Sequence, residues 1–149
     1  MGKLFSCLAG FCVLSALTGC APQTQQFAGD NPKLGSQTGV REGGLIKTKD
    51  QPGFLVYGPY VALEPGIYRL VAKGNLAGPN KALGAIDVVF GKAENVLAIK
   101  PIVTNQATGG NIASLAFEVP QAVTDAEFRI HVDAQTTGSF VAYELTKIQ

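Results

Sequence analysis

Apolar and polar side chains alternate with a period of two along much of the chain after residue 43. The clearest example is the segment 127–133, where apolar side chains face one side of the chain and polar side chains face the other. The apolar positions are Phe128, Ile130 and Val132, and the polar positions are Glu127, Arg129, His131 and Asp133. This alternation, rich in β-branched and aromatic residues, is typical of a half-buried β-strand.

Further segments follow the same pattern, and turn-forming residues separate them. The segments are Ile67–Lys73, Ile86–Phe90, Leu115–Val119 and Val141–Leu145, and we expect Val141, Tyr143 and Leu145 to face the core together. Turns are predicted at sequences such as Glu64-Pro65-Gly66, and apolar residues do not recur at helical spacing. The pattern predicts an all-β fold, an antiparallel β-sandwich of jelly-roll type over residues 45–149.

A different pattern opens the chain, because Leu4 to Leu17 form an uncharged, almost continuous apolar run. The run fits the core of a signal peptide and falls short of the roughly 20 residues that a membrane span needs. The sequence Leu17-Thr18-Gly19-Cys20 that ends it resembles the lipobox of bacterial lipoproteins. The resemblance implies cleavage after residues 1–19 and lipid attachment at Cys20. An uncleaved transmembrane anchor is the alternative.

The residue after Cys20 bears on the destination of such a lipoprotein. It is Ala21 rather than Asp. By the sorting convention of the lipoproteins that the motif resembles, this implies transport to the outer membrane. The expected location is therefore the bacterial cell envelope, and the sequence leaves open whether the protein faces the periplasm or the cell surface.

Residues 21–44 have few apolar side chains and are dominated by Gln, Thr, Gly, Pro, Ser and Asn. This composition predicts a flexible linker between the lipidated Cys20 and the sandwich domain. In the alternative interpretation the segment folds along the surface of the domain, with Phe27, Leu34 and Val40 as its anchors.

Cysteine content and charge narrow the possible functions. The three cysteines are Cys7, Cys12 and Cys20, so removal of residues 1–19 leaves no thiol pair for a disulfide. The same cleavage removes Lys3 and leaves basic and acidic residues balanced. Balanced charge without a basic block argues against a nucleic-acid partner.

Residues that would carry catalysis or bind a metal are sparse. His131 is the only histidine, and its row of charged neighbours is best explained as a solvated strand face. Zinc would lack ligands, and the acidic residues do not cluster in a loop at the spacing that calcium needs. We therefore predict a protein without a metal or cofactor that is not an enzyme.

One stretch carries a family resemblance. Phe54–Tyr68 reads FLVYGPYVALEPGIY, and its Tyr-Gly-Pro-Tyr run followed by Leu, Pro-Gly and Tyr resembles the opening of carbohydrate-binding-module-like β-sandwich domains. Such domains often accompany bacterial glycosyltransferases and polysaccharide enzymes. The resemblance spans Gly53 to about Ile148, and it implies a sandwich with a glycan as ligand.

Sugar sites commonly place an aromatic face against the C–H groups of a sugar ring, and this chain has no tryptophan. Tyr57 and Tyr60 are the candidate stacking residues, with Asp87 and Arg129 as polar partners. The alternative is that the tyrosines pack against the edge of the sandwich and that the polar pair forms an internal salt bridge.

The sequence thus predicts an outer-membrane lipoprotein whose β-sandwich module binds an envelope glycan or polysaccharide. The alternative is a structural or interaction subunit of a protein complex in the cell envelope. Exposed tyrosines in a shallow groove with convergent polar groups would favour the first. A larger apolar patch or an unprotected sheet edge would favour the second.

Overall fold

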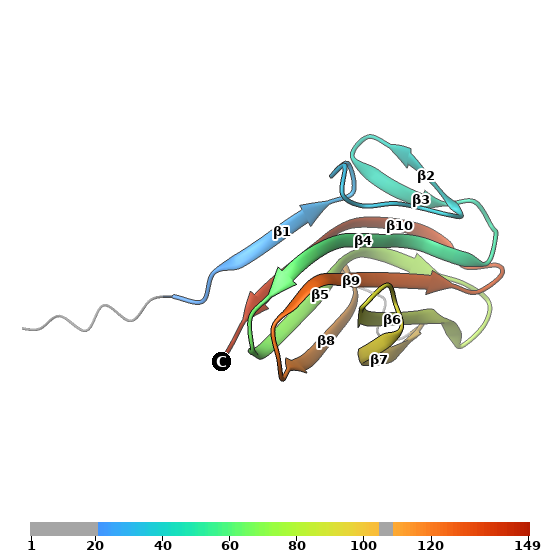
Figure 1. Ribbon diagram of the computed structural model, residues 1–149. Coiled ribbons are helices and arrows are strands. Elements are labelled where there is room, and N and C mark those ends of the chain that lie inside the picture. Colours follow the sequence, from blue (N-terminus) through green and yellow to red (C-terminus); the bar gives the residue numbers. More distant parts are fainter. Residues whose placement is uncertain (1–20, 105–108) are drawn as a thin grey trace, which may run out of the picture.

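The protein is a β-sandwich of two antiparallel sheets (Figure 1). The computed structural model describes residues 21–104 and 109–149, and every regular element in these ranges is a strand. The strands are β1 (Thr24–Ala28), β2 (Gly39–Glu42), β3 (Leu45–Thr48), β4 (Gly53–Leu63), β5 (Gly66–Ala77), β6 (Ala82–Phe90), β7 (Asn95–Val103), β8 (Asn111–Val119), β9 (Val123–Val132) and β10 (Thr137–Lys147). The described part of the chain contains no helix long and apolar enough to cross a bilayer. The predicted all-β sandwich is confirmed.

We call the two layers the large sheet and the small sheet. The large sheet has the order β2-β3-β10-β5-β8, and β1 also pairs with β10. The small sheet has the order β4-β9-β6-β7. Because β1 pairs with the second half of β10 and β3 pairs with its first half, these two short strands lie end to end along the same edge of β10.

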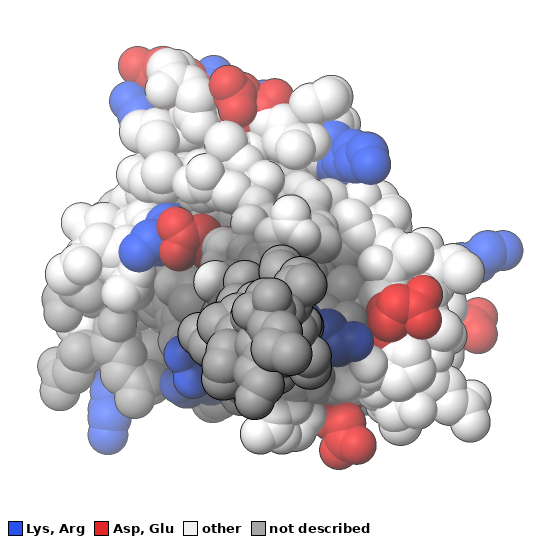
Figure 2. All heavy atoms as spheres, turned by 90° about the vertical axis from the view of Figure 1, so that its left-hand side faces the viewer, with Lys and Arg blue, Asp and Glu red and all other residues white. Residues whose placement is uncertain are grey.

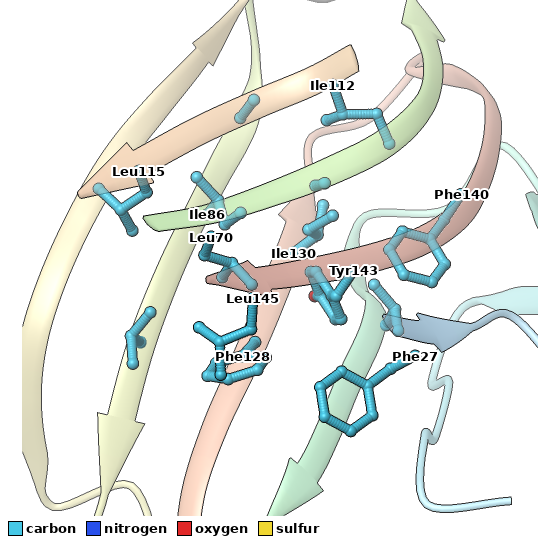
Figure 3. Packing of buried hydrophobic residues seen from close by; sticks show 14 of the residues in the cluster. Phe27, Leu70, Ile86, Ile112, Leu115, Phe128, Ile130, Phe140, Tyr143 and Leu145 are labelled. Carbon is cyan, nitrogen blue, oxygen red and sulfur yellow. The ribbon is translucent and has the colours of Figure 1, made fainter. Parts of the chain in front are cut away.

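The core lies between the sheets and is built from the apolar positions of the alternating segments. Phe128, Ile130 and Val132 are fully buried, as the pattern predicts. Figure 3 shows Phe128 of the small sheet beside Tyr143 of the large sheet, with ring centroids 5.6 Å apart in an edge-to-face arrangement. Burial of each large side chain stabilises the fold by about 1.5–3 kcal/mol.

One apolar position of the last segment does not face the core. Val141 is 41% exposed, whereas Phe140, Tyr143 and Leu145 are buried. The register between β10 and β5 shifts between Phe140 and Ala142, so Val141 is an extra residue and its side chain turns outward. The expectation that Val141 packs with Tyr143 and Leu145 was therefore wrong.

The expected flexible linker at residues 21–44 is corrected as well, because most of this segment belongs to the domain. β1 adds to the large sheet, and Gly35 forms an isolated antiparallel bridge with Tyr57 of the small sheet. Phe27 and Leu34 are buried, but Val40 is 44% exposed, so only two of the three suggested anchors enter the core. The sandwich therefore begins at β1 rather than at residue 45.

The segment contacts both layers and so covers one edge of each sheet. Phe27 packs edge-on against Phe128, with ring centroids 6.3 Å apart. The amides of Gln37 and Thr38 both donate to the carbonyl of Phe54 on β4. The expected signal peptide, residues 1–19, and the expected lipidation site, Cys20, lie outside the described residues.

Charged side chains are mixed over the end of the molecule at which β1 begins. Figure 2 shows acidic and basic groups interspersed among uncharged residues on this face. The mixed surface agrees with the near-zero net charge of the sequence.

Candidate functional site

The outer face of the small sheet carries most of the polar residues identified in the sequence. Strand pairing aligns Tyr57, Arg129, Asp87 and Ile99 in one row across β4, β9, β6 and β7. Directly opposed residues of antiparallel strands share a face. The predicted partners Asp87, Arg129 and Tyr57 therefore lie next to one another on the surface and not in the core.

A pocket of about 310 Å³ lies at the β4–β9 side of this face. Its floor includes Glu127 and Arg129 of β9, and aromatic side chains of β4 form its walls. The full set of lining residues is Gln37, Phe54, Tyr57, Tyr60, Ala93, Glu127 and Arg129. We call this the aromatic pocket.

Both predicted tyrosines line this pocket even though their spacing of three would place them on opposite faces of a regular strand. The β4–β9 register shifts between Pro59 and Val61, so Tyr60 is the extra residue of a bulge-like irregularity in β4. Tyr60 has a φ of 61°, a conformation that costs a residue with a side chain about 1 kcal/mol or more. The irregularity directs its ring toward the pocket, where the residue is 49% exposed.

The N-terminal segment positions Tyr57 through its contact with Gly35. Its backbone exchanges two hydrogen bonds with Gly35, with N···O distances of 2.8 and 3.0 Å. A Cβ atom on Gly35 would clash with the Tyr57 ring, so the glycine makes room for the aromatic wall. The same segment places Gln37 at the rim, and Gln37 Oε1 accepts a hydrogen bond from the Phe54 amide at 3.1 Å.

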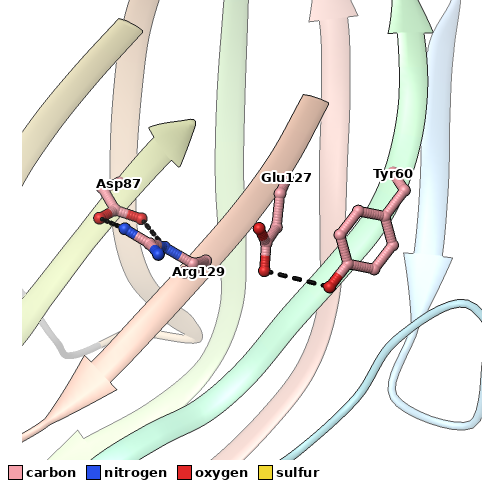
Figure 4. Close-up of polar contacts among 4 residues, drawn as sticks. All are labelled: Tyr60, Asp87, Glu127 and Arg129. Carbon is pink, nitrogen blue, oxygen red and sulfur yellow. Dashed lines mark hydrogen bonds and ion pairs between the residues drawn. The ribbon is translucent and has the colours of Figure 1, made fainter. Parts of the chain in front are cut away.

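Arg129 and Asp87 form a two-point ion pair beside the pocket. Arg129 Nε donates to Asp87 Oδ1 at 2.9 Å, and Nη2 donates to Oδ2 at 2.6 Å (Figure 4). These bonds, which outweigh the effect of desolvation, raise the pKa of Arg129. The guanidinium carbon also lies 4.9 Å from the centroid of the Phe54 ring, a cation–π geometry. The pair fixes the arginine in place and cancels its charge locally.

Glu127 is the residue whose environment the sequence pattern described wrongly. The charged row of β9 was expected to be a solvated strand face, yet Glu127 is only 8% exposed. The Tyr60 hydroxyl donates to Glu127 Oε1 at 3.3 Å (Figure 4). Burial raises the pKa of Glu127, and the opposing effects of Arg129 and the Tyr60 hydrogen bond do not cancel this rise. Tyr60 is affected in turn, because its burial and the nearby Glu127 charge raise its own pKa.

A short turn between β6 and β7 completes the pocket by bringing Ala93 to its wall. The Asp125 carboxylate accepts hydrogen bonds from the amides of Gly91 and Lys92, both at 3.0 Å. These two bonds lower the pKa of Asp125. The Asp125 side chain therefore positions the turn by accepting hydrogen bonds from the backbone of the turn. Asp125 does not line the pocket itself.

Three of the four ligand-binding residues predicted from the sequence line the aromatic pocket: Tyr57, Tyr60 and Arg129. The fourth, Asp87, adjoins it as the partner of Arg129. The suggested salt bridge is thus present, but on the outer face. Sequence reasoning missed Gln37, Phe54, Ala93 and Glu127, and only Glu127 carried a signal, through its place on the strand face of Arg129.

The pocket combines hydrogen-bonding groups, charge and aromatic surface. The pocket offers carboxylate, guanidinium, phenol and amide groups close to three aromatic rings. His131 stands at one side, edge-on to Phe54 with centroids 5.5 Å apart. Within residues 21–104 and 109–149, no group of three or more His, Cys, Asp or Glu side chains is arranged to hold a metal ion.

A second depression, of about 430 Å³, lies on the outer face of the large sheet. Its lining residues are Gln26, Lys73, Gly74, Asn75, Gly110, Ser139, Val141 and Glu144, none of which is aromatic. We call this the polar groove.

Comparison with known proteins gives a likeness in fold. No protein-family model matches the chain, and no curated protein matches it in sequence. Among solved structures, it is similar to the C-terminal CBM6 of LamC, a marine laminarinase from Zobellia galactanivorans, with a TM-score of 0.54 and 14% identity over 84% of this chain and 100% of that one. It is also similar to the VP2 subviral particle of infectious bursal disease virus, with a TM-score of 0.43 and 11% identity over 85% of this chain and 32% of that one.

The first of these neighbours is a carbohydrate-binding module. At this identity the likeness shows the fold alone. It confirms the β-sandwich that the sequence resemblance implied, of the kind found in carbohydrate-binding modules.

Proposed function

We propose that the protein is a non-catalytic module that binds a glycan in the aromatic pocket. The observation that carries this proposal is the convergence of Tyr57, Tyr60 and Phe54 around Glu127 and Arg129 in one open depression. An apolar lining with a few fixed polar groups is the usual composition of a small-ligand site. The CBM6 neighbour supports the same class of ligand.

The side chains match the surface of a sugar. A pyranose ring has faces lined by C–H groups, which pack on aromatic rings, and a rim of hydroxyls that donate and accept hydrogen bonds. Tyr60, the most exposed of the ring residues in the pocket, supplies the stacking surface in this proposal. Glu127 accepts hydrogen bonds from sugar hydroxyls, and Arg129 donates to them.

The direct test is calorimetric titration of the domain with bacterial polysaccharides and peptidoglycan fragments. We expect binding to one class of glycan, and a loss of roughly 30-fold in Tyr60→Ala and in Tyr57→Ala, because removal of each ring gives up about 2 kcal/mol of contact. Ile99→Ala, which changes an exposed residue of the same face outside the pocket, is the matched control.

Two results would contradict the proposal. One is the absence of binding to every glycan tested, which would favour the alternative of an interaction subunit in an envelope complex. The other is binding that Ile99→Ala weakens as much as the tyrosine variants do. Circular dichroism and thermal unfolding establish that each variant keeps the fold.

We also infer that the module is anchored to the outer membrane by lipid on Cys20. The Leu17–Cys20 motif and Ala21 after it support this proposal. Only three residues separate Cys20 from β1, so the domain would lie within about 14 Å of the lipidated residue. Incorporation of a labelled fatty acid in bacterial cells, lost in Cys20→Ala, is the expected result, and equal labelling of both forms would refute it.

A further inference from the structure

The carboxylate of Glu127 is unusual for this molecule because it is largely buried and yet lines a pocket. Its Oε1 atom accepts a hydrogen bond from Tyr60, whereas Oε2 makes no hydrogen bond or ion pair with the described residues and is not fully buried. A buried carboxylate is costly unless charged or hydrogen-bonding groups compensate it. Among the described residues one hydroxyl donates to Glu127, and Oε2 can still accept a hydrogen bond from a group in the pocket.

In the described part of the chain, no neighbouring charged group forms an ion pair with the Glu127 carboxylate. Among the described residues, Arg129 is the cation whose charge acts on Glu127, but it directs two nitrogens at Asp87 and forms no ion pair with Glu127. The other charged groups that act on Glu127 are Asp87 and Asp125, both acidic, and Tyr60, whose pKa is raised, stays neutral at ordinary pH. Because the formal charges of Asp87 and Arg129 cancel, ionised Glu127 gives the pocket a net negative charge.

The walls of the pocket also suit a cation. Phe54, Tyr57 and Tyr60 all line it, and the electron-rich faces of aromatic rings attract ammonium groups. Phe54 already has such a contact with the Arg129 guanidinium. An aromatic lining around a buried carboxylate combines the two kinds of group that recognise an amine.

We propose that the ligand of the aromatic pocket is an amino sugar with a free, unsubstituted amino group, which donates to Glu127 while the sugar ring packs on Tyr60. This inference rests on the proposed function and narrows its substrate class. The ammonium forms a charge-assisted hydrogen bond, which is about twice as strong as the neutral bond from a hydroxyl. A uronic acid would bring a second negative charge to Glu127 and be repelled.

The test uses three β-1,4-linked oligosaccharides of equal length that differ only at carbon 2 of each ring. They are oligomers of glucosamine, N-acetylglucosamine and glucose, titrated at about pH 6 and again at about pH 7, because the raised pKa of Glu127 delays its ionisation while amines stay largely protonated. We expect the glucosamine oligomer to bind about tenfold to a hundredfold more tightly than the other two.

Glu127→Gln isolates the charge, because glutamine keeps the size of the side chain and can still accept a bond from Tyr60. We expect this variant to lose the preference for glucosamine, while Asp133→Asn, just after the end of β9 and outside the pocket lining, keeps it. A preference that survives in Glu127→Gln would overturn the assignment of the amine to this carboxylate.

The other outcomes separate this inference from the proposed function. Equal binding of all three oligomers, or tighter binding of glucose or uronate polymers, would overturn the amino-sugar inference and leave glycan binding in place. Absence of binding by any oligosaccharide or polysaccharide would overturn both. Binding of a free alkylamine as tightly as the glucosamine oligomer would also overturn the inference, because the sugar ring would then contribute nothing.

Discussion

The aromatic pocket and the polar groove are two depressions of comparable size on opposite faces of one sandwich, at about 310 and 430 Å³. Each contains a glutamate and a basic residue. In the pocket, Glu127 is buried against aromatic rings and Arg129 is bound to Asp87. In the groove, Glu144 is more exposed and lies 3.9 Å from Lys73, which itself donates to Asn111.

Volume alone does not favour the aromatic pocket, because the polar groove is the larger of the two. What distinguishes the pocket is that its polar groups are fixed and partly desolvated, whereas those of the groove remain in contact with water. Electrostatic interactions are worth several times more in the first setting than in the second. Specific recognition is therefore expected at the pocket, even though it is the smaller of the two.

The largest effect is expected from breaking the support of the pocket at Leu34. This residue is 2% exposed and anchors the segment that carries Gly35 and Gln37 to the pocket. Leu34→Ala should destabilise the protein by about 2–5 kcal/mol, measured by chemical denaturation. Hydrogen exchange should show lost protection at Tyr57 and retained protection in β5 and β8, which form part of the large sheet. Uniform loss across both sheets would contradict this division.

An intermediate effect is expected from the ion pair that fixes the pocket arginine. Asp87→Asn replaces a charged acceptor of two hydrogen bonds and should cost about 1.5–3 kcal/mol in unfolding free energy. Glu144→Gln, the matched change in the groove, should cost less than about 0.5 kcal/mol, because its ion pair is long and solvated. Equal costs for the two variants would remove the distinction between the sites.

The smallest effect concerns the pH dependence of stability. Because burial raises the pKa of Glu127, the folded protein binds this proton more tightly than the unfolded chain does. The resulting stabilisation is complete below the unfolded pKa and is lost as the pH rises through the raised pKa. Glu127→Gln should therefore melt at a higher temperature than the wild type at neutral pH, and the difference should shrink in acid. A lower melting temperature at neutral pH would contradict the sign.

The alternating pattern was sufficient to predict the sandwich, because strand periodicity reports directly which side chains face a core. Phe128, Ile130 and Val132 are buried as this rule requires. The rule fails where the strand is irregular, since the bulge that turns Val141 outward depends on pairing with β5 and leaves no mark in the local sequence.

The candidate site was predictable only in part for a related reason. Periodicity placed Arg129 and Glu127 on one outer face but did not reveal what covers that face. The Tyr60 side chain contacts Glu127 because the backbone of Tyr60 has a positive φ, which the strand pattern does not predict. Gln37 lines the pocket although its segment has the polar composition of a linker. That segment nevertheless folds onto the domain, because Phe27 and Leu34 are buried in the core and β1 pairs with β10.

The pairing of β1 with β10 has a mechanical consequence for a module anchored upstream of Thr24, as we propose. The backbone hydrogen bonds between antiparallel strands run perpendicular to the strand axis. Tension applied along β1 therefore loads the bonds of five residue pairs, Thr24–Ala28 with Ala142–Thr146, in shear and not one after another. The load passes to β10, which β5 holds on its other side, so traction between a bound glycan and the membrane would be borne by the interior of the large sheet.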